Sequence, residues 1–413
     1  MGIRRRLVAI AVGVMVGPGL GRAQPGATPA PAPTASTPTI ELHGIIGGSL
    51  YGQDAALGPF AGGGAWFVTG VPARDPWSLG GDVRQTRLNL AAVGPPVAGG
   101  VTPRGVLELD LFGGPGPGGY GDVSVVPRLR LAYAELRAGR STLQVGQNTS
   151  LVLALVPVTV GHAAYPLSIA AGTIGWRYPG VFALHAVPLG GRRGTLEFGV
   201  MLARPAWQNP AAAPASDALV SQDAMGIGLG EASGLPQVEV RLKLTRPGLD
   251  AFVAGHVHRV DRTGTGATTG PQIDLTVRAA VAGAKLVAGR VTVAGAGYVG
   301  QNLAPLLGGL LQFQGPTRGD VREWGGWAQA VVAVGPRTSL GALAGTARLR
   351  SSDAAAAELA RRHNTVVSAL ARYQLGGYAV GLEVTRWRTA RATDAGVVTL
   401  TGDQLMASAM YTF

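Results

Sequence analysis

Residues 237–244 read Gln-Val-Glu-Val-Arg-Leu-Lys-Leu, in which polar and aliphatic side chains alternate. Successive side chains of a β-strand point to opposite faces, so the aliphatic residues of this stretch share one face and the polar residues share the other. A strand with this pattern lies between two different solvents. The stretch therefore predicts a strand that is apolar on one side and wet on the other.

The same alternation recurs in further segments, which are 107–111, 128–133, 196–202, 273–278 and 380–385. In each of them we expect the apolar residues to face outward and the charged residues to face a wet interior. The mean hydropathy is +0.24, yet beyond the first residues no run of 18 apolar residues occurs. Alternating strands in lipid would hide this apolar surface without helical spans. The predicted fold class is therefore all-β, a transmembrane antiparallel β-barrel.

The connections between the strands fall into two lengths. Short ones lie near 139–140, 189–194, 246–248, 288–289, 335–336 and 376–377, and long ones near 52–83, 113–127, 148–172, 204–236, 261–272, 302–322, 350–362 and 389–401. Short periplasmic turns and long external loops are typical of outer-membrane barrels, and these long loops imply about 16 strands. Pro179-Gly180 is compatible with a bulge or with a hairpin turn. We expect one strand over 174–187, because this keeps 204–236 outside.

The N-terminal region predicts export. Three arginines at 4–6 precede the apolar run 7–16, and small residues follow near Ala23, as in a secretory signal peptide. A membrane anchor is the alternative. The net charge of +12 includes four arginines of this leader, so the exported chain carries +8. The chain is thus expected to consist of a signal peptide (1–23), a Pro/Ala-rich disordered linker (24–38) and an outer-membrane β-barrel (39–413).

The last residues carry an assembly signal. Apolar and aromatic residues alternate up to the terminus, at Leu405, Ala407, Ala409, Tyr411 and Phe413. A final strand that ends in an aromatic residue, with Tyr411 two positions before Phe413, looks like the signal that the barrel-assembly machinery reads. The alternative is an ordinary edge strand that ends in phenylalanine.

The sequence lacks the motifs on which several kinds of catalytic, phosphate-binding and metal sites depend. The chain has no cysteine, which excludes disulfides and thiolate sites. The glycine-rich stretch 113–119 lacks the Lys-Ser/Thr of a phosphate loop, and no catalytic motif occurs. His256 and His258 share a strand face but lack a third metal ligand, and the basic residues are scattered. We therefore expect no enzyme activity, cofactor, metal or nucleic-acid partner.

Several segments resemble trimeric sixteen-stranded porins of the DcaP-like and phosphate-selective groups. The likeness rests on 40–44, 84–90, 105–113, 128–136 and 145–147, which match the first strands and the approach to the third loop. It covers about the first third of the chain and is architectural afterwards. The resemblance implies a homotrimer in a Gram-negative outer membrane. Two departures are the missing N-terminal coiled coil and the apolar character of 148–160.

A porin selects solutes by the charges on its lumen wall. The pore-lining candidates, which fall on polar strand faces, are Arg87, Glu108, Asp110, Arg128, Arg130 and Arg241. Arginines opposite acids would set a transverse field across the lumen. The alternative is that these charges pair across strands and stabilise the wall. The apolar loop 148–172 would narrow the pore, pack on the inner wall or lie at a subunit contact, and its His162 is expected to be structural.

The leading hypothesis is a passive diffusion channel for small hydrophilic solutes, with a mild preference for anions of the carboxylate type. Such ion transport would involve outer-membrane lipid, the assembly machinery and small anionic solutes as partners. Two alternatives stay open, which are a non-conducting barrel that acts as an adhesin or assembly factor and a barrel-borne enzyme.

Overall fold

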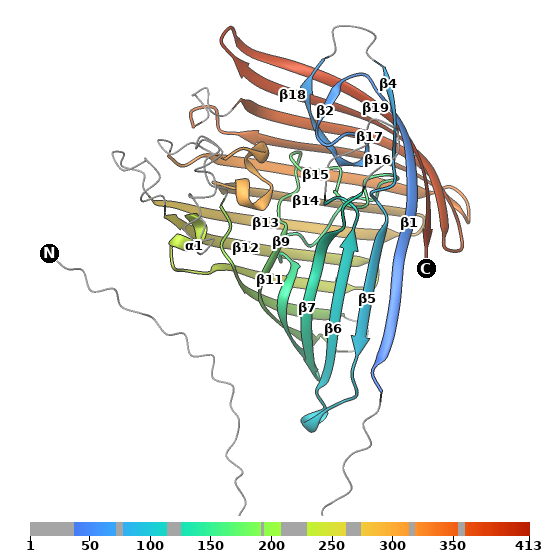
Figure 1. Ribbon diagram of the computed structural model, residues 1–413, viewed down its shortest axis with the longest axis vertical. Helices are drawn as coiled ribbons and strands as arrows, with labels where there is room; N and C mark the ends of the chain where they lie inside the picture. The colour runs from blue at the N-terminus through green and yellow to red at the C-terminus, as the bar shows by residue number, and fades with distance from the viewer. Residues whose placement is uncertain are drawn as a thin grey trace, which may run out of the picture. The chain divides into compact units, whose positions relative to one another are not determined.

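Seventeen strand segments form one antiparallel sheet that closes on itself (Figure 1). β4 and β5 both pair with β1 and are two parts of one interrupted strand, so the barrel has 16 strands. The sheet closes where β1 pairs with β19, from Ile45 opposite Thr412 to Gln53 opposite Gln404. This confirms the predicted all-β antiparallel barrel.

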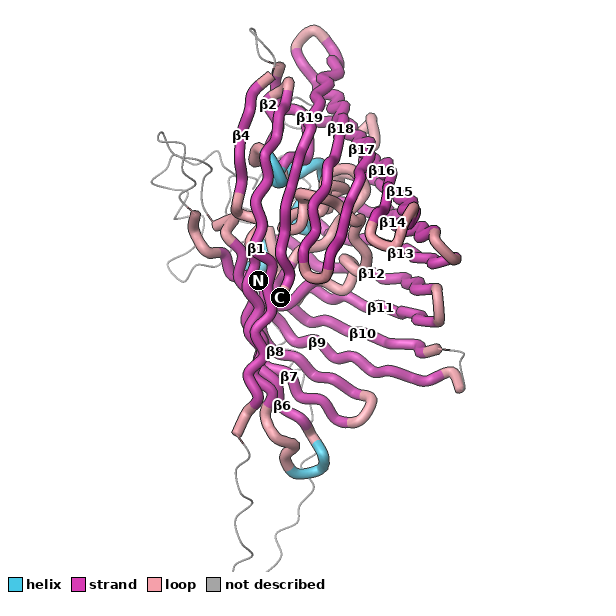
Figure 2. The backbone as a smooth tube through the Cα atoms, turned by 90° about the vertical axis from the view of Figure 1, so that its right-hand side faces the viewer, coloured by secondary structure: helices cyan, strands magenta, loops and turns pink. Residues whose placement is uncertain are grey.

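The strands of the barrel are β1 (Thr39–Gln53), β4 (Ser78–Asp82), β5 (Arg87–Val93), β6 (Thr102–Asp110), β7 (Arg128–Ala138), β8 (Ser141–Thr149), β9 (Arg177–Pro188), β10 (Thr195–Ala203), β11 (Gln237–Arg246), β12 (Leu249–Asp261), β13 (Asp274–Ala288), β14 (Val291–Gln301), β15 (Arg322–Ala333), β16 (Thr338–Leu349), β17 (Arg361–Leu375), β18 (Tyr378–Thr393) and β19 (Gly396–Thr412). Consecutive hairpins lie side by side around the wall (Figure 2).

The computed structural model describes residues 37–71, 77–113, 125–190, 194–207, 229–261, 274–313, 319–353 and 360–413. The expected signal peptide (1–23) lies outside the described residues, as does the expected linker (24–38) up to residue 36. No helix in the described ranges is long and apolar enough to cross a membrane.

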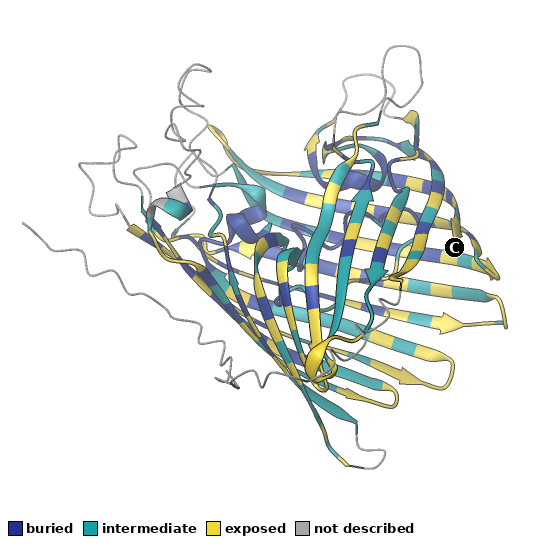
Figure 3. Ribbon diagram, turned by 60° about the horizontal axis from the view of Figure 1, so that its bottom comes forward, coloured by how far each residue is buried: buried dark blue, intermediate teal, exposed yellow. Residues whose placement is uncertain are grey.

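Side chains alternate between the two faces of the wall, as the bands of exposed and buried residues along the strands show (Figure 3). In β11, Val240 is exposed on the outer face, whereas Glu239 is completely buried on the inner face. The stretch 237–244 therefore has the predicted orientation, with its apolar residues outside and its polar residues inside.

The predicted orientation is wrong for residues 274–278, and Ile273 lies outside the described residues. Leu275 and Val277 of β13 are buried on the inner face, and Asp274, Thr276 and Arg278, which alternate with them, face outward. The physical reason is that this inner face packs against Leu303 and Leu306 of a loop that folds into the barrel. The outer face here lies at the loop end of the strand, where polar residues are tolerated.

The connections follow the predicted division into two rims, with one exception. β9 runs as one strand through Pro179-Gly180, as expected. The exception is 389–401, which is not a long loop. β18 and β19 stay paired up to Thr393 and Gly396, and a two-residue turn joins them. Backbone pairing continues here although the outward alternation of apolar residues has ended.

Three long connections fold into the barrel, where Figure 1 shows them inside the ring of strands. We name them L1 (54–71), L3 (150–176) and L6 (302–313). L1 contains the hairpin of β2 (Ala56–Pro59) and β3 (Ala65–Gly70) around η1 (Gly62–Gly64), and L6 contains η4 (Ala304–Leu306) and η5 (Gly309–Leu311). Two further short helices are η2 (Ala98–Gly100) and α1 (Leu229–Ala232).

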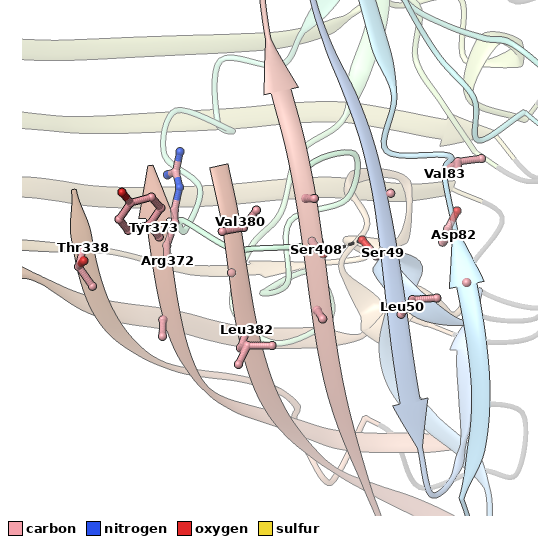
Figure 4. A pocket seen from close by; sticks show the side chains of 16 residues that line it. Ser49, Leu50, Asp82, Val83, Thr338, Arg372, Tyr373, Val380, Leu382 and Ser408 are labelled. Atoms are coloured by element: carbon pink, nitrogen blue, oxygen red, sulfur yellow. Dashed lines mark hydrogen bonds between the residues drawn. The ribbon is translucent and has the colours of Figure 1, made fainter. Parts of the chain in front are cut away.

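Small residues line the seam where the barrel closes. The hydroxyl oxygens of Ser49 and Ser408 lie 2.6 Å apart across the β1–β19 pair (Figure 4). Gly44 and Phe413 exchange two backbone hydrogen bonds of 3.1 Å. A Cβ on Gly44 would lie 2.7 Å from the carbonyl oxygen of Arg87 and 2.8 Å from the Phe413 ring, so the seam requires glycine here.

Candidate pore constriction

The predicted pore-lining residues of β5, β6 and β7 come together on the inner face of the wall. Arg128 forms a bidentate pair with Asp110, at 3.0 Å and 2.6 Å. Arg130 donates to the same carboxylate at 2.7 Å and to Glu108 at 2.5 Å. Arg87 lies 3.7 Å from Glu108. The alternation of these strands puts the five side chains on one face, and the strand register sets their pairing.

These arginines also hold L3 against the wall. Arg87 donates to the carbonyl oxygen of Ala163 at 2.6 Å, and Arg130 donates to that of Ala164 at 3.1 Å. Arg128 donates to the hydroxyl of Tyr165. The loop therefore passes directly over the charged part of the wall, and the guanidinium groups contact both the wall acids and the loop.

Aromatic rings of L3 cover the same charges. The guanidinium carbon of Arg128 lies 4.3 Å from the centre of the Tyr165 ring, and that of Arg177 lies 3.9 Å from the Trp176 ring. The two rings stack on each other with centroids 5.6 Å apart. Such contacts stabilise cations at the face of an aromatic ring.

We name the four guanidinium groups of Arg87, Arg128, Arg130 and Arg177 the arginine cluster. Arg177 adjoins the others through the Trp176 ring, whose centre lies 3.9 Å from the guanidinium carbon of Arg177 and 5.5 Å from that of Arg128. Within the described residues, the acids that pair with the cluster are Glu108 and Asp110, so four arginines face two carboxylates there. The cluster therefore keeps an excess of two positive charges at the place where L3 crosses the wall.

The remaining predicted residues lie elsewhere. Arg241 of β11 pairs with Glu197 of β10 at 2.8 Å and is not part of the arginine cluster. Tyr411 stacks between Tyr378, at 4.5 Å between ring centroids, and Phe413, at 6.1 Å. The aromatic terminus thus forms part of the outer surface beside the closing seam.

The wall residues that anchor L3 were missed by the sequence analysis. Glu239 of β11 accepts hydrogen bonds from the hydroxyl of Ser150 at 2.7 Å and from the backbone N–H of Leu151 at 2.6 Å. Gln329 of β15 bonds both backbone groups of Val158, at 2.8 Å and 2.6 Å. L3 therefore crosses the lumen from one side of the wall to another.

Two further contacts complete the path of L3. Glu383 of β18 accepts from the backbone N–H of Val160 at 2.6 Å, and Asn364 of β17 donates to the carbonyl oxygen of Ala170 at 3.0 Å. The sequence did contain a signal for such anchors. A loop as apolar as 148–160 cannot satisfy its own backbone groups inside a barrel, so the inward polar residues of the wall must supply partners.

His256 and His258 extend the Glu239 anchor to another loop. The carboxylate of Glu239 lies 2.8 Å from Nδ1 of His256. Nε2 of His256 lies 2.8 Å from Nδ1 of His258, and Nε2 of His258 lies 3.1 Å from the carbonyl oxygen of Ala206. Every ring nitrogen of the two histidines thus lies within hydrogen-bond distance of a partner, so this chain links L3 to the loop at Ala206 through the wall.

The interior is more apolar than the expected wet lumen. Trp327, Trp387, Leu343 and Val366 of the wall are buried against L1 and L3. His162 of L3 is also buried, and this burial lowers the pKa of its imidazole. The reason for the difference is that L1, L3 and L6 bring their own apolar side chains into the barrel, and the facing wall matches them.

No family model and no curated protein sequence matches the chain. The chain is similar to the outer membrane channel DcaP of Acinetobacter baumannii, with a TM-score of 0.68 and 15% identity over 91% of this chain and 98% of that one. It is similar to Salmonella typhi OmpF, solved with daunomycin, with a TM-score of 0.58 and 14% identity over 91% and 97% of the two chains. It is also similar to OmpT of Vibrio cholerae, with a TM-score of 0.53 and 11% identity over 92% and 99%.

At these identities the comparisons concern the fold. Near-complete coverage of both chains means that the whole barrel is matched, including its closure. The chain therefore has the fold of the outer-membrane porins, a closed antiparallel barrel of 16 strands.

Proposed function

We propose that this chain is an outer-membrane porin that passes small hydrophilic solutes by passive diffusion, with a mild preference for anions of the carboxylate type. The porin-like barrel supports the channel. The arginine cluster, with its excess of two positive charges beside L3, is the observation that carries the anion preference.

The preference is expected to be mild for two reasons. Half of the cluster's positive charge is paired with Glu108 and Asp110, and this pairing weakens the electrostatic attraction for a passing anion. Charges in an aqueous passage are also screened over about 8–10 Å at physiological salt. Selectivity should therefore weaken as the salt concentration rises.

Three partners belong to the proposal, namely outer-membrane lipid, the barrel-assembly machinery and two further copies of this chain. A hollow of about 840 Å³ on the outer face spans β16–β19, β1 and β4, and small residues such as Gly48, Gly81, Ala407 and Ala409 line it (Figure 4). Small residues let backbones approach closely between membrane proteins, which supports a subunit contact there. OmpT of Vibrio cholerae has been solved in a trimer form.

The test is the reversal potential of purified protein in planar bilayers across a salt gradient. The wild type should favour anions, and Arg87→Ala/Arg128→Ala/Arg130→Ala should shift toward cations. A matched control removes three charges from the opposite rim, through Arg140→Ala, Arg246→Ala and Arg290→Ala. A wild-type preference for cations, or equal shifts in both triple variants, would contradict the role of the cluster.

A second candidate is a barrel that does not conduct, such as an adhesin or assembly factor. The observation that favours it is the apolar packing of L1 and L3 against Trp327 and Trp387 inside the barrel. The same bilayer recordings separate the two candidates, because a folded barrel that inserts without any conductance would favour the second.

A further inference from the structure

The outer face of the barrel changes from apolar to cationic toward the loop end of β16 and β18. On β18 the outward positions Val380, Leu382 and Val384 are apolar and exposed, and Arg386 and Arg388 follow them. β16 repeats the change, with Leu340, Ala342 and Ala344 followed by Arg348. These two strands, which flank β17, thus place outward arginines beyond an apolar surface.

The arginines lie one bilayer thickness from the aromatic residues of the opposite rim. Arg388 is ten residues from Tyr378 on β18, and His363 is ten residues from Tyr373 on β17. Ten residues span roughly 33 Å along a strand and about 25 Å along the membrane normal at a tilt near 40°. This matches the apolar band of an outer-membrane barrel, so these side chains reach the headgroups of the external leaflet.

Some of the outward arginines are neutralised by a neighbouring acid. Arg322 forms a bidentate pair with Asp353, at 2.7 Å and 2.9 Å. The guanidinium group lowers the pKa of this carboxyl, so the pair stays ionised near neutral pH. Arg386 pairs with Asp403 at 2.7 Å and 2.6 Å. These two pairs contribute no net charge to the surface.

Arg348 and Arg388 are different, because neither forms an ion pair within the part of the chain that the structure describes. Arg348 is opposite His363 in the register of β16 and β17, and Arg388 is opposite Thr365 in that of β17 and β18. Their strands are two steps apart, which separates the two side chains by roughly 10 Å across the sheet. Among the described residues, two exposed positive charges therefore lie beside His363 without a paired acid.

A hollow on the outer surface places apolar side chains beside the guanidinium group of Arg348. Its volume is about 470 Å³, and Val299, Trp324, Arg348 and Arg350 are among the residues that line it. Trp324 is 48% exposed and Val299 is 60% exposed on the outer surface. An indole beside guanidinium groups at headgroup level suits a molecule that has an anionic head and an apolar body.

We propose that Arg348 and Arg388, together with the hollow at Trp324, bind the phosphate group of an anionic lipid in the external leaflet. This inference rests on the proposed outer-membrane location. The guanidinium groups would form bidentate hydrogen bonds to phosphate oxygens, and Trp324 would contact the upper part of the lipid. The site would hold lipid at the loop ends of β15–β18, whereas the proposed subunit contact lies toward the short-turn ends of β16–β18.

Native mass spectrometry of the purified barrel in detergent tests the proposal. The probes are a bis-phosphorylated glucosamine lipid, the same lipid without its phosphates, and inorganic phosphate as competitor. The wild type should bind the phosphorylated lipid at least tenfold more tightly than the dephosphorylated one. Arg348→Gln/Arg388→Gln should lose this difference, and Arg246→Gln/Arg290→Gln, which removes two exposed charges at the other rim, should keep it.

Equal binding of the two lipids by the wild type would overturn the proposal, and so would loss of the difference in the control variant. Displacement of the lipid by inorganic phosphate at an equal concentration of phosphate groups would show an anion site without a lipid. Conductance of the same preparation tests the channel separately. A conducting barrel that does not discriminate between the lipids refutes this inference alone, whereas a non-conducting one refutes the proposed function.

Discussion

Replacing Glu239 with glutamine should loosen L3 from the wall more than any comparable change of charge on the neighbouring strand. The Glu239 side chain is completely buried and accepts from Ser150, Leu151, Val152 and His256. Glutamine keeps the volume but turns one oxygen into an NH₂ group. When the NH₂ group faces Leu151 and Val152, it meets two backbone donors; in the opposite orientation these N–H groups keep an acceptor, but a neutral one.

The expected cost follows from these contacts. A hydrogen bond to a charged group contributes about 1.5–3 kcal/mol to stability, against about 0.5–1.5 kcal/mol for a neutral one. The hydroxyl of Ser150 and the backbone N–H groups of Leu151 and Val152 lose a buried charged acceptor in this variant. The matched control is Glu197→Gln on β10, whose partly exposed pair with Arg241 should contribute at most about 1 kcal/mol.

Urea unfolding in detergent, followed by tryptophan fluorescence, measures both variants against the wild type. Glu239→Gln should lower the midpoint strongly at an unchanged slope, and single-channel recordings should show new current fluctuations as L3 detaches. Equal midpoints for Glu239→Gln and Glu197→Gln would refute the assignment of Glu239 as the anchor of L3.

Gly44→Ala should lower the free energy of unfolding by about 1–3 kcal/mol, because the added Cβ would overlap the Phe413 ring and the Arg87 carbonyl. Gly105→Ala is the control, since its Cβ would meet open space, and urea midpoints compare the two variants. Deleting Phe413 should reduce the amount of folded barrel in the membrane more than its thermal stability, and equal assembly would count against the terminal signal. Mass spectrometry of the exported chain should find a start near Gln24, and a retained leader would contradict the signal-peptide prediction.

The strands were predictable because lipid and water impose opposite requirements on the two faces of each one. The prediction failed where this contrast ends. Residues 396–400 of β19 alternate poorly, since their outer face lies beyond the apolar band, and they were taken for a loop although they pair with β18. Leu275 and Val277 were assigned to the wrong face because the interior at that point is apolar protein rather than water.

The candidate site was predictable in part, because alternation places Arg87, Arg128 and Arg130 on polar faces, whereas Arg177 of the site was not predicted and Arg241 lies outside it. Alternation alone places Arg128, Arg130 and Asp110 on one inner face. Which acid pairs with which arginine depends on the register of β6 and β7, including the bulge between Glu108 and Leu109, and no sequence pattern reveals this. The path of L3 is set by long-range contacts of the same kind.

Three buried glutamates that bind loop backbone groups affect the electrostatic potential inside the barrel. Glu239, Glu323 and Glu383 each accept hydrogen bonds from loop backbone N–H groups, and at most 5% of each residue is exposed. The side chains of Arg87 and Arg128 keep 20% and 18% exposure beside L3. Peptide donors therefore compensate these three carboxyl groups, while parts of the Arg87 and Arg128 side chains stay accessible beside L3. The proposed anion preference rests on this local difference in burial and not on the net charge of the whole chain.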